Sequence, residues 1–388
     1  SYDCAGIKTP LKGSTQEKKG KLYPPKGMPG TAWLGAIGGV YLEGSNLFET
    51  LMLNLVMANP EASSRVGLFD EGDAAPWEME KPSVDYVVRN PRGFVDALTL
   101  QSRRIRLIPD EDHPDRVKGV VLSYGDIIHP TKMHGVEQMT SWRESPAQQK
   151  ALQTVEVPCM PKGHDSSRAL WRGLEAILAQ DEAGKDLRPG VIRWFESLQD
   201  AEAGNHLPRS YTVHAQGVEY GSQSSVVSNA FDDAINLGSA LTHTESSAPA
   251  KTIELISKTD QAVTRLAILV RSVESIGGNR ADPASLRSAP DDTRERAYDE
   301  LDGLFRERIA HFSDAVSRSS YCTVWINEVH RILLRLGHEY VASSSVSRFE
   351  RDEKFGSVSD VESRYRRMLD KILGNLPDRG RQEGGKQR

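Results

Sequence analysis

Residues 322–342 read CTVWINEVHRILLRLGHEYVA, and apolar side chains recur in this stretch every three or four positions. The side chains that fall on or near one stripe are Val324, Val329, Leu333, Leu336 and Tyr340. This spacing is typical of a helix that buries one face. Three further stretches have the same spacing, namely 253–276, 294–315 and 361–376. Four helices with short to moderate connections predict a four-helix bundle.

The bundle places a domain boundary near residue 240. We expect the bundle to occupy residues 241–376, and the polar residues 377–388 to form a disordered tail. Gly277, Gly278, Pro283 and Pro290 predict the loop between the first two helices of the bundle. Residues 1–240 mix strand and helix patterns, so the predicted fold class is α+β, a mixed α/β region followed by the bundle.

The strongest patterns before residue 240 are strand–helix pairs. Residues 33–42 are apolar and glycine-rich, which predicts a strand, and Ser45 or Asn46 can cap a helix that follows it. Residues 94–108 predict a short helix that runs into a basic strand. The β-branched residues 117–124 then predict a second strand, and the two strands together predict a hairpin.

Two later stretches complete the first region. Residues 165–180, DSSRALWRGLEAILAQ, predict one amphipathic helix with a strong N-cap. Residues 206–220 are rich in strand-forming residues and end in a small polar turn that carries Gln223.

The composition limits the classes of function. The 388 residues carry a net charge of −5, with 27% charged and 38% hydrophobic residues, as in soluble globular proteins. A protein that coats nucleic acid by itself needs many cations, so any nucleic-acid contact is expected to be local. No apolar run is long enough to span a bilayer. Three widely spaced cysteines form no disulfide framework and no zinc motif, which predicts a reducing cytoplasm and no structural metal or cofactor.

The first 26 residues hold six lysines and a single acidic glutamate after Asp3, among glycines and prolines. This strip, which includes Lys18 and Lys19, is either a solvated surface loop or a contact for phosphate groups. Gln223 also leaves two interpretations, because an amide at the tip of a turn faces water in most proteins but can also wedge beside a base pair.

No sequence motif indicates a catalytic centre. The glycines at 35–40 do not match GxGxxG, and the chain has no nucleophile elbow, P-loop or HExxH motif. One alternative remains open, a metal-dependent phosphohydrolase built around His129, His134, His164 and Asp165. The plainer interpretation is that His164 and Asp165 begin a helix.

Several strings, taken together and in order, resemble one family. They are YDCAGIK, WLGAIGGVYLEGSNLFETLMLNLV, PWE, LTLQSRRIRL, GVVLSYGD, MTSWRESPAQQK, MPKGHDSSRALWRGLEAIL and VEYGSQSS. They resemble CasA, the large-subunit family of the type I-E CRISPR surveillance complex Cascade. The strings extend over residues 2–225, and the predicted bundle extends the resemblance to about residue 376. Members of the family usually extend further at the N-terminus, so we expect that this chain lacks natural N-terminal sequence.

The resemblance implies a non-enzymatic subunit that recognises the protospacer-adjacent motif of foreign double-stranded DNA. Such a subunit reads the motif from the minor groove, helps to open the duplex and recruits a helicase–nuclease. The implied partners are the other Cascade subunits with crRNA, the target DNA and the helicase–nuclease, with no membrane and in the cytoplasm. The alternative within a non-enzymatic role is a scaffold whose bundle only docks other subunits.

The resemblance also suggests DNA-binding residues. Gly6 matches the family's glycine-rich loop, Lys132 matches its lysine finger, and Gln223 matches its glutamine wedge, with Ser222 and Ser224 beside it. Lys18 and Lys19 then become, at most, contacts to the DNA backbone.

Overall fold

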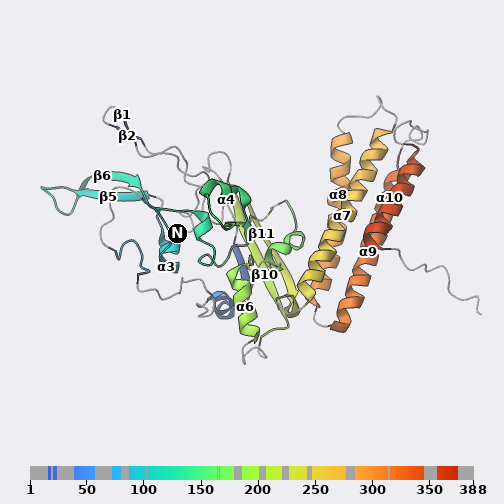
Figure 1. Cartoon of the computed structure of the whole chain (residues 1–388), viewed down its shortest axis with the longest axis horizontal. Helices are drawn as coiled ribbons and strands as arrows, with labels where there is room; N and C mark the ends of the chain where they lie inside the picture. Colours follow the sequence, from blue (N-terminus) through green and yellow to red (C-terminus); the bar gives the residue numbers. More distant parts are fainter. Residues whose placement is uncertain are drawn as a thin grey trace, which may run out of the picture. The chain divides into compact units, whose positions relative to one another are not determined.

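The computed structural model describes the backbone of residues 16–18, 21–23, 39–56, 72–79, 87–101, 103–163, 165, 167–178, 186–200, 207–220, 227–242, 247–276, 285–312, 315–344 and 356–374. The chain divides into two compact units, Ser1–Asn236 and Leu237–Arg388. The first unit mixes strands with short helices, whereas the second consists of long helices (Figure 1). The predicted α+β class is therefore confirmed.

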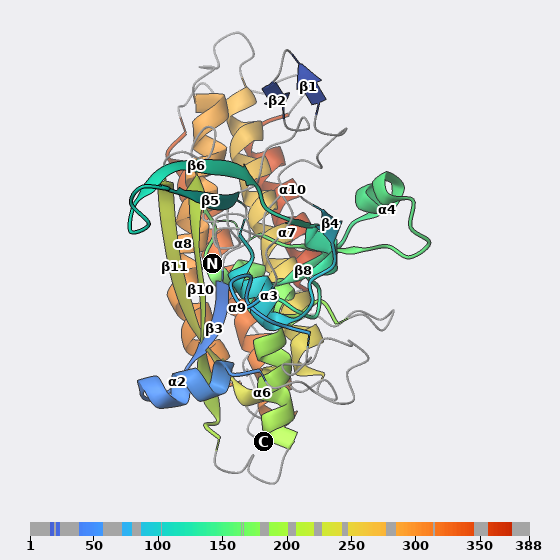
Figure 2. The same ribbon diagram turned by 90° about the vertical axis from the view of Figure 1, so that its left-hand side faces the viewer.

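A three-stranded sheet organises the first unit. It contains β3 (Gly39–Glu43), β10 (Ser210–Tyr220) and β11 (Val227–Gly238) in the order β11-β10-β3 (Figure 2). β10 runs antiparallel to β3, so that Ala215 lies opposite Val40. Side chains alternate across these strands, and those on one face, such as Val40 and Val213, are fully buried. One face of the sheet therefore belongs to the hydrophobic core.

Helix α2 (Leu47–Asn54) follows β3 directly, as the sequence predicts. Asn46 caps the helix, because its Oδ1 accepts a hydrogen bond from the backbone N of Glu49 at 3.0 Å. Asn54 at the other end donates to the carbonyl of Leu42 at 2.6 Å and accepts from its backbone N at 2.9 Å. Both ends of the helix are thus fixed by side-chain hydrogen bonds, and the second end is tied to the strand.

The predicted helix and hairpin are also present. α3 (Phe94–Thr99) precedes β5 (Arg103–Pro109), which pairs antiparallel with β6 (Val117–Tyr124). The strand β4 (Val88–Arg89) lies parallel to β7 (Ile127–Ile128) near the base of the hairpin.

The remaining elements of the first unit are short. They are β1 (Gln16–Lys18), β2 (Lys21–Tyr23), the 3-10 helix η2 (Pro130–Lys132), β8 (Trp142–Glu144), α4 (Pro146–Leu152), β9 (Cys159–Pro161), the 3-10 helix η3 (Leu170–Gly173), α5 (Glu175–Leu178) and α6 (Gly190–Asp200). β1 pairs with β2 and β8 pairs with β9, both antiparallel.

The prediction of one continuous helix over residues 165–180 is wrong. The described part of this stretch forms η3 and then α5, with Gly173 at the end of the 3-10 turn. The backbone N of Leu170 donates to Asp233 of β11 at 2.7 Å, so a tertiary hydrogen bond replaces a helical one at this point. The apolar spacing is correct for burial, because Leu170, Trp171, Leu174, Ile177 and Leu178 are all buried.

The second unit contains the bundle helices α7 (Ala248–Ser275), α8 (Ser285–Ala310), α9 (Ala315–Ala342) and α10 (Val358–Leu373), preceded by the 3-10 turn η6 (Ser239–Leu241). Helix α7 packs against each of the other three helices. The core is aromatic at its centre, where the rings of Phe305 and Trp325 meet edge to face at 5.2 Å. Trp325 donates to the hydroxyl of Thr259 at 3.1 Å, which satisfies its buried N–H.

Two details of the bundle correct the sequence analysis. Pro290 lies inside α8 rather than in the preceding loop, beyond the first turn, where it has no N–H to donate to the carbonyl one turn earlier. Val324 is exposed, and Trp325 is buried in its place. Trp325, Val329 and Leu333 are four residues apart and therefore lie on the same face of the helix. The predicted tail lies outside the described residues.

Two observations on membrane-spanning helices and cysteines hold for the described part of the chain. Within it, no helix is both long and apolar enough to cross a membrane. Its two cysteines, Cys159 and Cys322, are free thiols.

Candidate nucleic-acid interface

Lys132 lies exposed at the end of the 3-10 turn η2, which a network of hydrogen bonds holds in place. His129 caps the turn, because its Nδ1 lies 2.8 Å from the hydroxyl of Thr131 and accepts from the backbone N of Thr131 at 3.3 Å. The backbone N of Lys132 donates to the carbonyl of His129 at 2.9 Å. The backbone of this lysine is therefore fixed, while its side chain reaches solvent.

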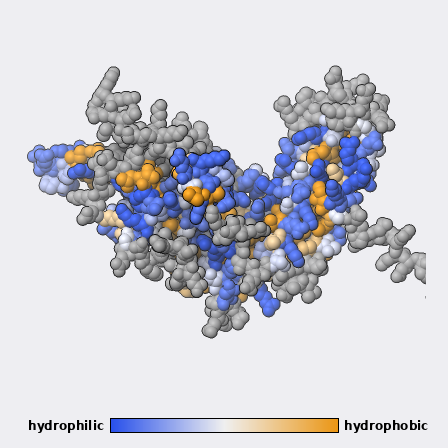
Figure 3. All heavy atoms as spheres, viewed as in Figure 1, coloured by the Kyte–Doolittle hydropathy of each residue, from blue (hydrophilic) through white to orange (hydrophobic). Residues whose placement is uncertain are grey.

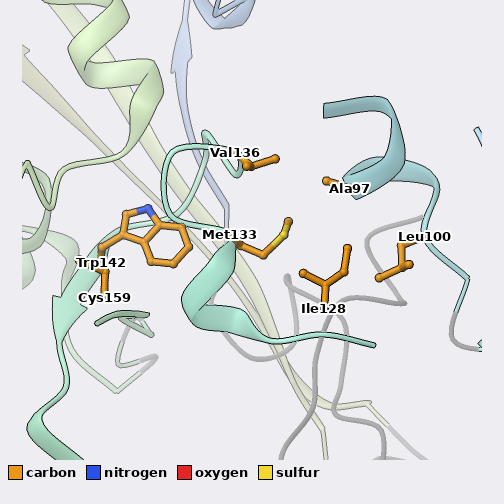
Figure 4. Close-up of a cluster of buried hydrophobic side chains, with 7 residues drawn as sticks. All are labelled: Ala97, Leu100, Ile128, Met133, Val136, Trp142 and Cys159. Atoms are coloured by element: carbon orange, nitrogen blue, oxygen red, sulfur yellow. The ribbon is translucent and has the colours of Figure 1, made fainter. Parts of the chain in front are cut away.

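Buried side chains on both sides anchor the same turn. Ile128 and Pro130 precede Lys132, and Met133 and Val136 follow it, all buried. Three of these four belong to a hydrophobic cluster drawn in Figure 4, whose members are Ala97, Leu100, Ile128, Met133, Val136, Trp142 and Cys159. The cluster joins α3, β7, β8 and β9, so the turn that carries the lysine is anchored in a buried hydrophobic cluster.

The electrostatics of the turn favour a single positive charge at Lys132. Burial lowers the pKa of His129, and the nearby charge of Lys132 lowers it further. His129 is therefore neutral at neutral pH and serves as a cap, not as a second cation. A lysine ammonium offers three hydrogen-bond donors and no acceptor, which suits a surface of acceptors.

The second candidate region is the ribbon formed by β10 and β11. At its base, His214 lies between two carboxylates, with Nε2 2.8 Å from Glu43 and Nδ1 3.6 Å from Asp232. The ring of His214 also stacks on Tyr41 at 4.7 Å. These contacts join β3, β10 and β11 across the exposed face, opposite the buried face that carries Val213 and Ala215.

Further along the ribbon, the strands leave the core. Gln216 donates to Asp232 at 2.9 Å, and the hydroxyl of Ser228 donates to the carbonyl of Glu219 at 2.9 Å. The first four residues of β11, beginning at Val227, are all exposed. The ribbon therefore has a fixed base and solvent-exposed strands next to residues 221–226.

Most of the other predicted contact residues lie outside the described residues. These are Gly6, Lys19, Ser222, Gln223 and Ser224. Lys18 lies in β1, where its backbone is opposite Lys21 of β2. Of the predicted DNA-binding residues, only Lys132 has a described side-chain environment.

The structure adds a cavity that the sequence analysis missed. It has a volume of about 150 Å³ and lies between β10–β11 and the segment around η3. Three cations and three carboxylates line it, namely Lys162, Arg168, Arg172, Asp165, Glu175 and Asp233. Only tertiary structure brings Asp233 to the others, so spacing along the chain could not reveal this site.

The charges in the cavity are balanced, and its acids are engaged by neighbouring groups. Asp233 accepts from the backbone N of Leu170 at 2.7 Å, and Lys162 lies 3.9 Å from Glu175. The hydroxyl of Ser167 donates to Asp165 and, together with its backbone N and the charges of Arg168 and Arg172, holds the pKa of Asp165 below its usual value.

The hypothesis of a metal-dependent phosphohydrolase gains no support from this geometry. His129 faces Thr131, and Nε2 of His134 lies 3.0 Å from the carbonyl of Asp186. Asp165 forms a local turn with Ser167, and His164 lies outside the described residues. Across the described residues, no group of three or more His, Cys, Asp or Glu side chains is placed to hold a metal ion.

Comparison with known proteins gives one family and several related folds. The sequence model of the family "CRISPR-associated protein Cse1" matches residues 1–336. The crystal structure of Cse1 from Thermobifida fusca is 30% identical, with a TM-score of 0.69 over 96% of this chain and 68% of that one. No curated protein matches.

Two more distant structures share the fold. Cse1 from Acidimicrobium ferrooxidans is 22% identical, with a TM-score of 0.68 over 96% of this chain and 70% of that one. CasA from Thermus thermophilus is 16% identical, with a TM-score of 0.61 over the same two shares.

Proposed function

This chain belongs to the CRISPR-associated Cse1 family, the large subunits of Cascade, and from that premise we propose that it recognises the protospacer-adjacent motif of foreign double-stranded DNA. In this proposal the first unit reads the motif from the minor groove and starts to separate the strands. Guide RNA in the assembled complex then tests the remaining sequence by base pairing.

The observation that carries the proposal is Lys132. The residue is exposed, its backbone is held by the His129 cap, and buried residues flank it on both sides. A minor groove displays mainly acceptor atoms, N3 of adenine and O2 of thymine, with the amino group of guanine as the exception. A lysine on a fixed turn can donate to these acceptors and loses little backbone entropy on binding, because its backbone is already ordered.

Gln223 is proposed to act next to this contact. It belongs to residues 221–226, which connect two strands whose base is fixed by the His214 contacts. A side chain inserted beside a base pair costs a few kcal/mol of unstacking, which pairing with the guide can offset. Ser222, Ser224 and Gly6 are proposed to approach the same part of the groove, and Lys18 and Lys19 to contact phosphates.

The proposal extends to partners and place. The chain would assemble with crRNA and the other Cascade subunits, bind target DNA, and recruit a helicase–nuclease that cuts it. We propose that the subunit itself catalyses no reaction and acts in the cytoplasm. A helical-bundle scaffold is the competing role, and it predicts no dependence of DNA binding on Lys132.

A reconstituted complex tests this directly. Lys132→Ala is expected to reduce discrimination between motif-bearing and scrambled duplexes by about tenfold, which is the lower end of the about 1–3 kcal/mol that a good bidentate base contact contributes. Lys150→Ala is the matched control, because Lys150 is also exposed and lies on α4, the next α-helix along the chain. Equal discrimination in the Lys132→Ala and Lys150→Ala variants would favour the scaffold role. Loss of discrimination in a His134→Ala variant alone would mean that another residue of this loop, not Lys132, makes the contact.

A further inference from the structure

The hairpin of β5 and β6 exposes an apolar face. Ile105 is 63% exposed, and Leu107 and its cross-strand partner Val120 are each more than half exposed. These three side chains lie on the same face, because Leu107 and Ile105 are two residues apart on one strand and Val120 pairs with Leu107. Figure 3 shows hydrophobic side chains over this ribbon, which Figure 1 shows extending away from α3.

The opposite face of the hairpin is mixed. It carries Arg104 and Arg106, which alternate with the apolar residues of β5, and Val121, which lies opposite Arg106 and is 44% exposed. Arg104 donates to Asp126 at 2.7 Å, and Asp126 also accepts from Arg89 at 3.0 Å. Asp126 therefore connects the base of the hairpin to β4, which contains Arg89. Arg106 is exposed further out along the strand. The hairpin is therefore held at its base and presents one aliphatic face and one face on which Arg106 lies beside Val121.

The edges of the hairpin are open as well. Among the described residues, β5 and β6 pair only with each other, so each strand leaves one row of backbone donors and acceptors without a strand beside it. A two-stranded sheet with an uncovered apolar face is marginally stable in water. Both properties favour the addition of a further strand.

We propose that the β5–β6 hairpin is a docking site for an extended segment of another Cascade protein, which adds to it as a third strand. Strand addition requires a segment whose side chains alternate between aliphatic and acidic residues. The aliphatic ones cover Ile105, Leu107 and Val120, and the acidic ones face Arg106. A protein is favoured over RNA because the exposed apolar side chains are aliphatic, whereas single-stranded nucleic acid stacks on aromatic rings.

The first experiment measures the binding of this chain to a subcomplex of the other Cascade subunits and crRNA by biolayer interferometry. The double substitution Ile105→Asp with Leu107→Asp is expected to raise Kd at least about tenfold, because charges are placed on a desolvated patch. Val155→Asp is the control, since Val155 is 97% exposed on a different loop, and it should leave Kd within about twofold.

The Ile105→Asp with Leu107→Asp variant should have the same melting temperature as the unsubstituted free chain, because the two replaced side chains are already exposed to solvent. A marked fall in this temperature would mean that the chain covers the face itself, and would overturn the proposal. Unchanged binding by the double variant would overturn it too. Motif-dependent DNA binding at saturating chain concentration is a separate readout, so failure here leaves the motif-recognition proposal standing.

Two further measurements identify the occupant. Arg106→Glu should weaken binding and reduce its dependence on salt, and hydrogen exchange should show protection of 103–109 or 117–124 on adding the subcomplex proteins. Protection by naked crRNA alone would assign the surface to RNA. Concentration-dependent dimers of the free chain, absent in the double variant, would assign it to a second copy.

Discussion

The two units of this protein treat their hydrophobic side chains in opposite ways. In the bundle α7–α10, the large apolar side chains of the described residues are buried or partly buried, except Ile268 and Val324. In the first unit, α2 exposes Leu47, Phe48 and Leu51, and the β5–β6 hairpin exposes a second apolar face. The bundle buries its apolar surface in its own core, whereas the first unit leaves such surface exposed.

Matched phenylalanines give the largest expected contrast between the units. Phe305→Ala removes a fully buried ring from the bundle and should lower the free energy of unfolding by about 3–5 kcal/mol. Phe48→Ala removes a ring that is 70% exposed and should change it by less than about 0.5 kcal/mol. Urea unfolding followed by circular dichroism measures both, and equal losses would abolish the contrast.

The first unit contains a network of ion pairs, whereas the core of the bundle contains packed aromatic rings. Asp126 binds Arg89 and Arg104, and Asp96 binds Arg89 with Nη2 to Oδ1 at 2.8 Å. Burial raises the pKa of both carboxyl groups, but the hydrogen bonds and charges of the arginines and of nearby backbone N–H groups outweigh it. Both pKa values therefore lie below the usual range.

This depression gives stability that is present above the unfolded pKa of about 3.9 and lost as the pH falls through the lower folded values. We expect the first unit to lose stability below about pH 4 for this reason. Asp126→Asn should cost about 2 kcal/mol at pH 7 and make the acid loss shallower. Melting curves from pH 7 to pH 2.5 test this, and an unchanged acid limb would remove the network from the explanation.

A smaller effect is expected for Gln223, in the residues that connect β10 and β11. Gln223→Ala should slow strand opening in the reconstituted complex by about tenfold while initial motif binding changes less, because the wedge acts after the motif is found. Permanganate footprinting of the target duplex measures opening. Unchanged footprints in this variant would argue against a wedge.

The smallest effect is expected in the N-terminal lysines. Lys18→Ala and Lys19→Ala should weaken binding to all DNA sequences alike and reduce the salt slope by about one for each phosphate that the chain no longer neutralises. An unaltered slope would make the strip a solvated loop.

Sequence patterns predict the fold well where a single element decides the outcome. The helix periodicity around Val329 and Leu333, the cap at Ser45 or Asn46 and the β5–β6 hairpin all depend on local spacing. The structure confirms them, with Asn46 as the cap. The prediction of one helix over 165–180 is wrong, because the backbone N–H of Leu170 donates to Asp233, a residue that is distant in sequence. The prediction that Val324 lies on the buried stripe is wrong, because the adjacent Trp325 occupies the buried position.

The candidate site is harder to predict for the same reason. The exposed position of Lys132 depends on Ile128, Met133 and Trp142 packing into one cluster, which no single spacing reveals. The cavity around Arg168 and the His214 contacts with Glu43 and Asp232 join segments that are far apart in sequence.

The most direct test concerns where motif recognition resides. It measures the ratio of the Kd values for scrambled and motif-bearing duplexes in complexes that carry either the natural chain or Lys132→Ala with Gln223→Ala. We expect the ratio to fall close to one in the double variant, while binding to a guide-matched single strand, which needs no motif, is unchanged. A double variant that keeps the full ratio would contradict the assignment of motif recognition to the first unit.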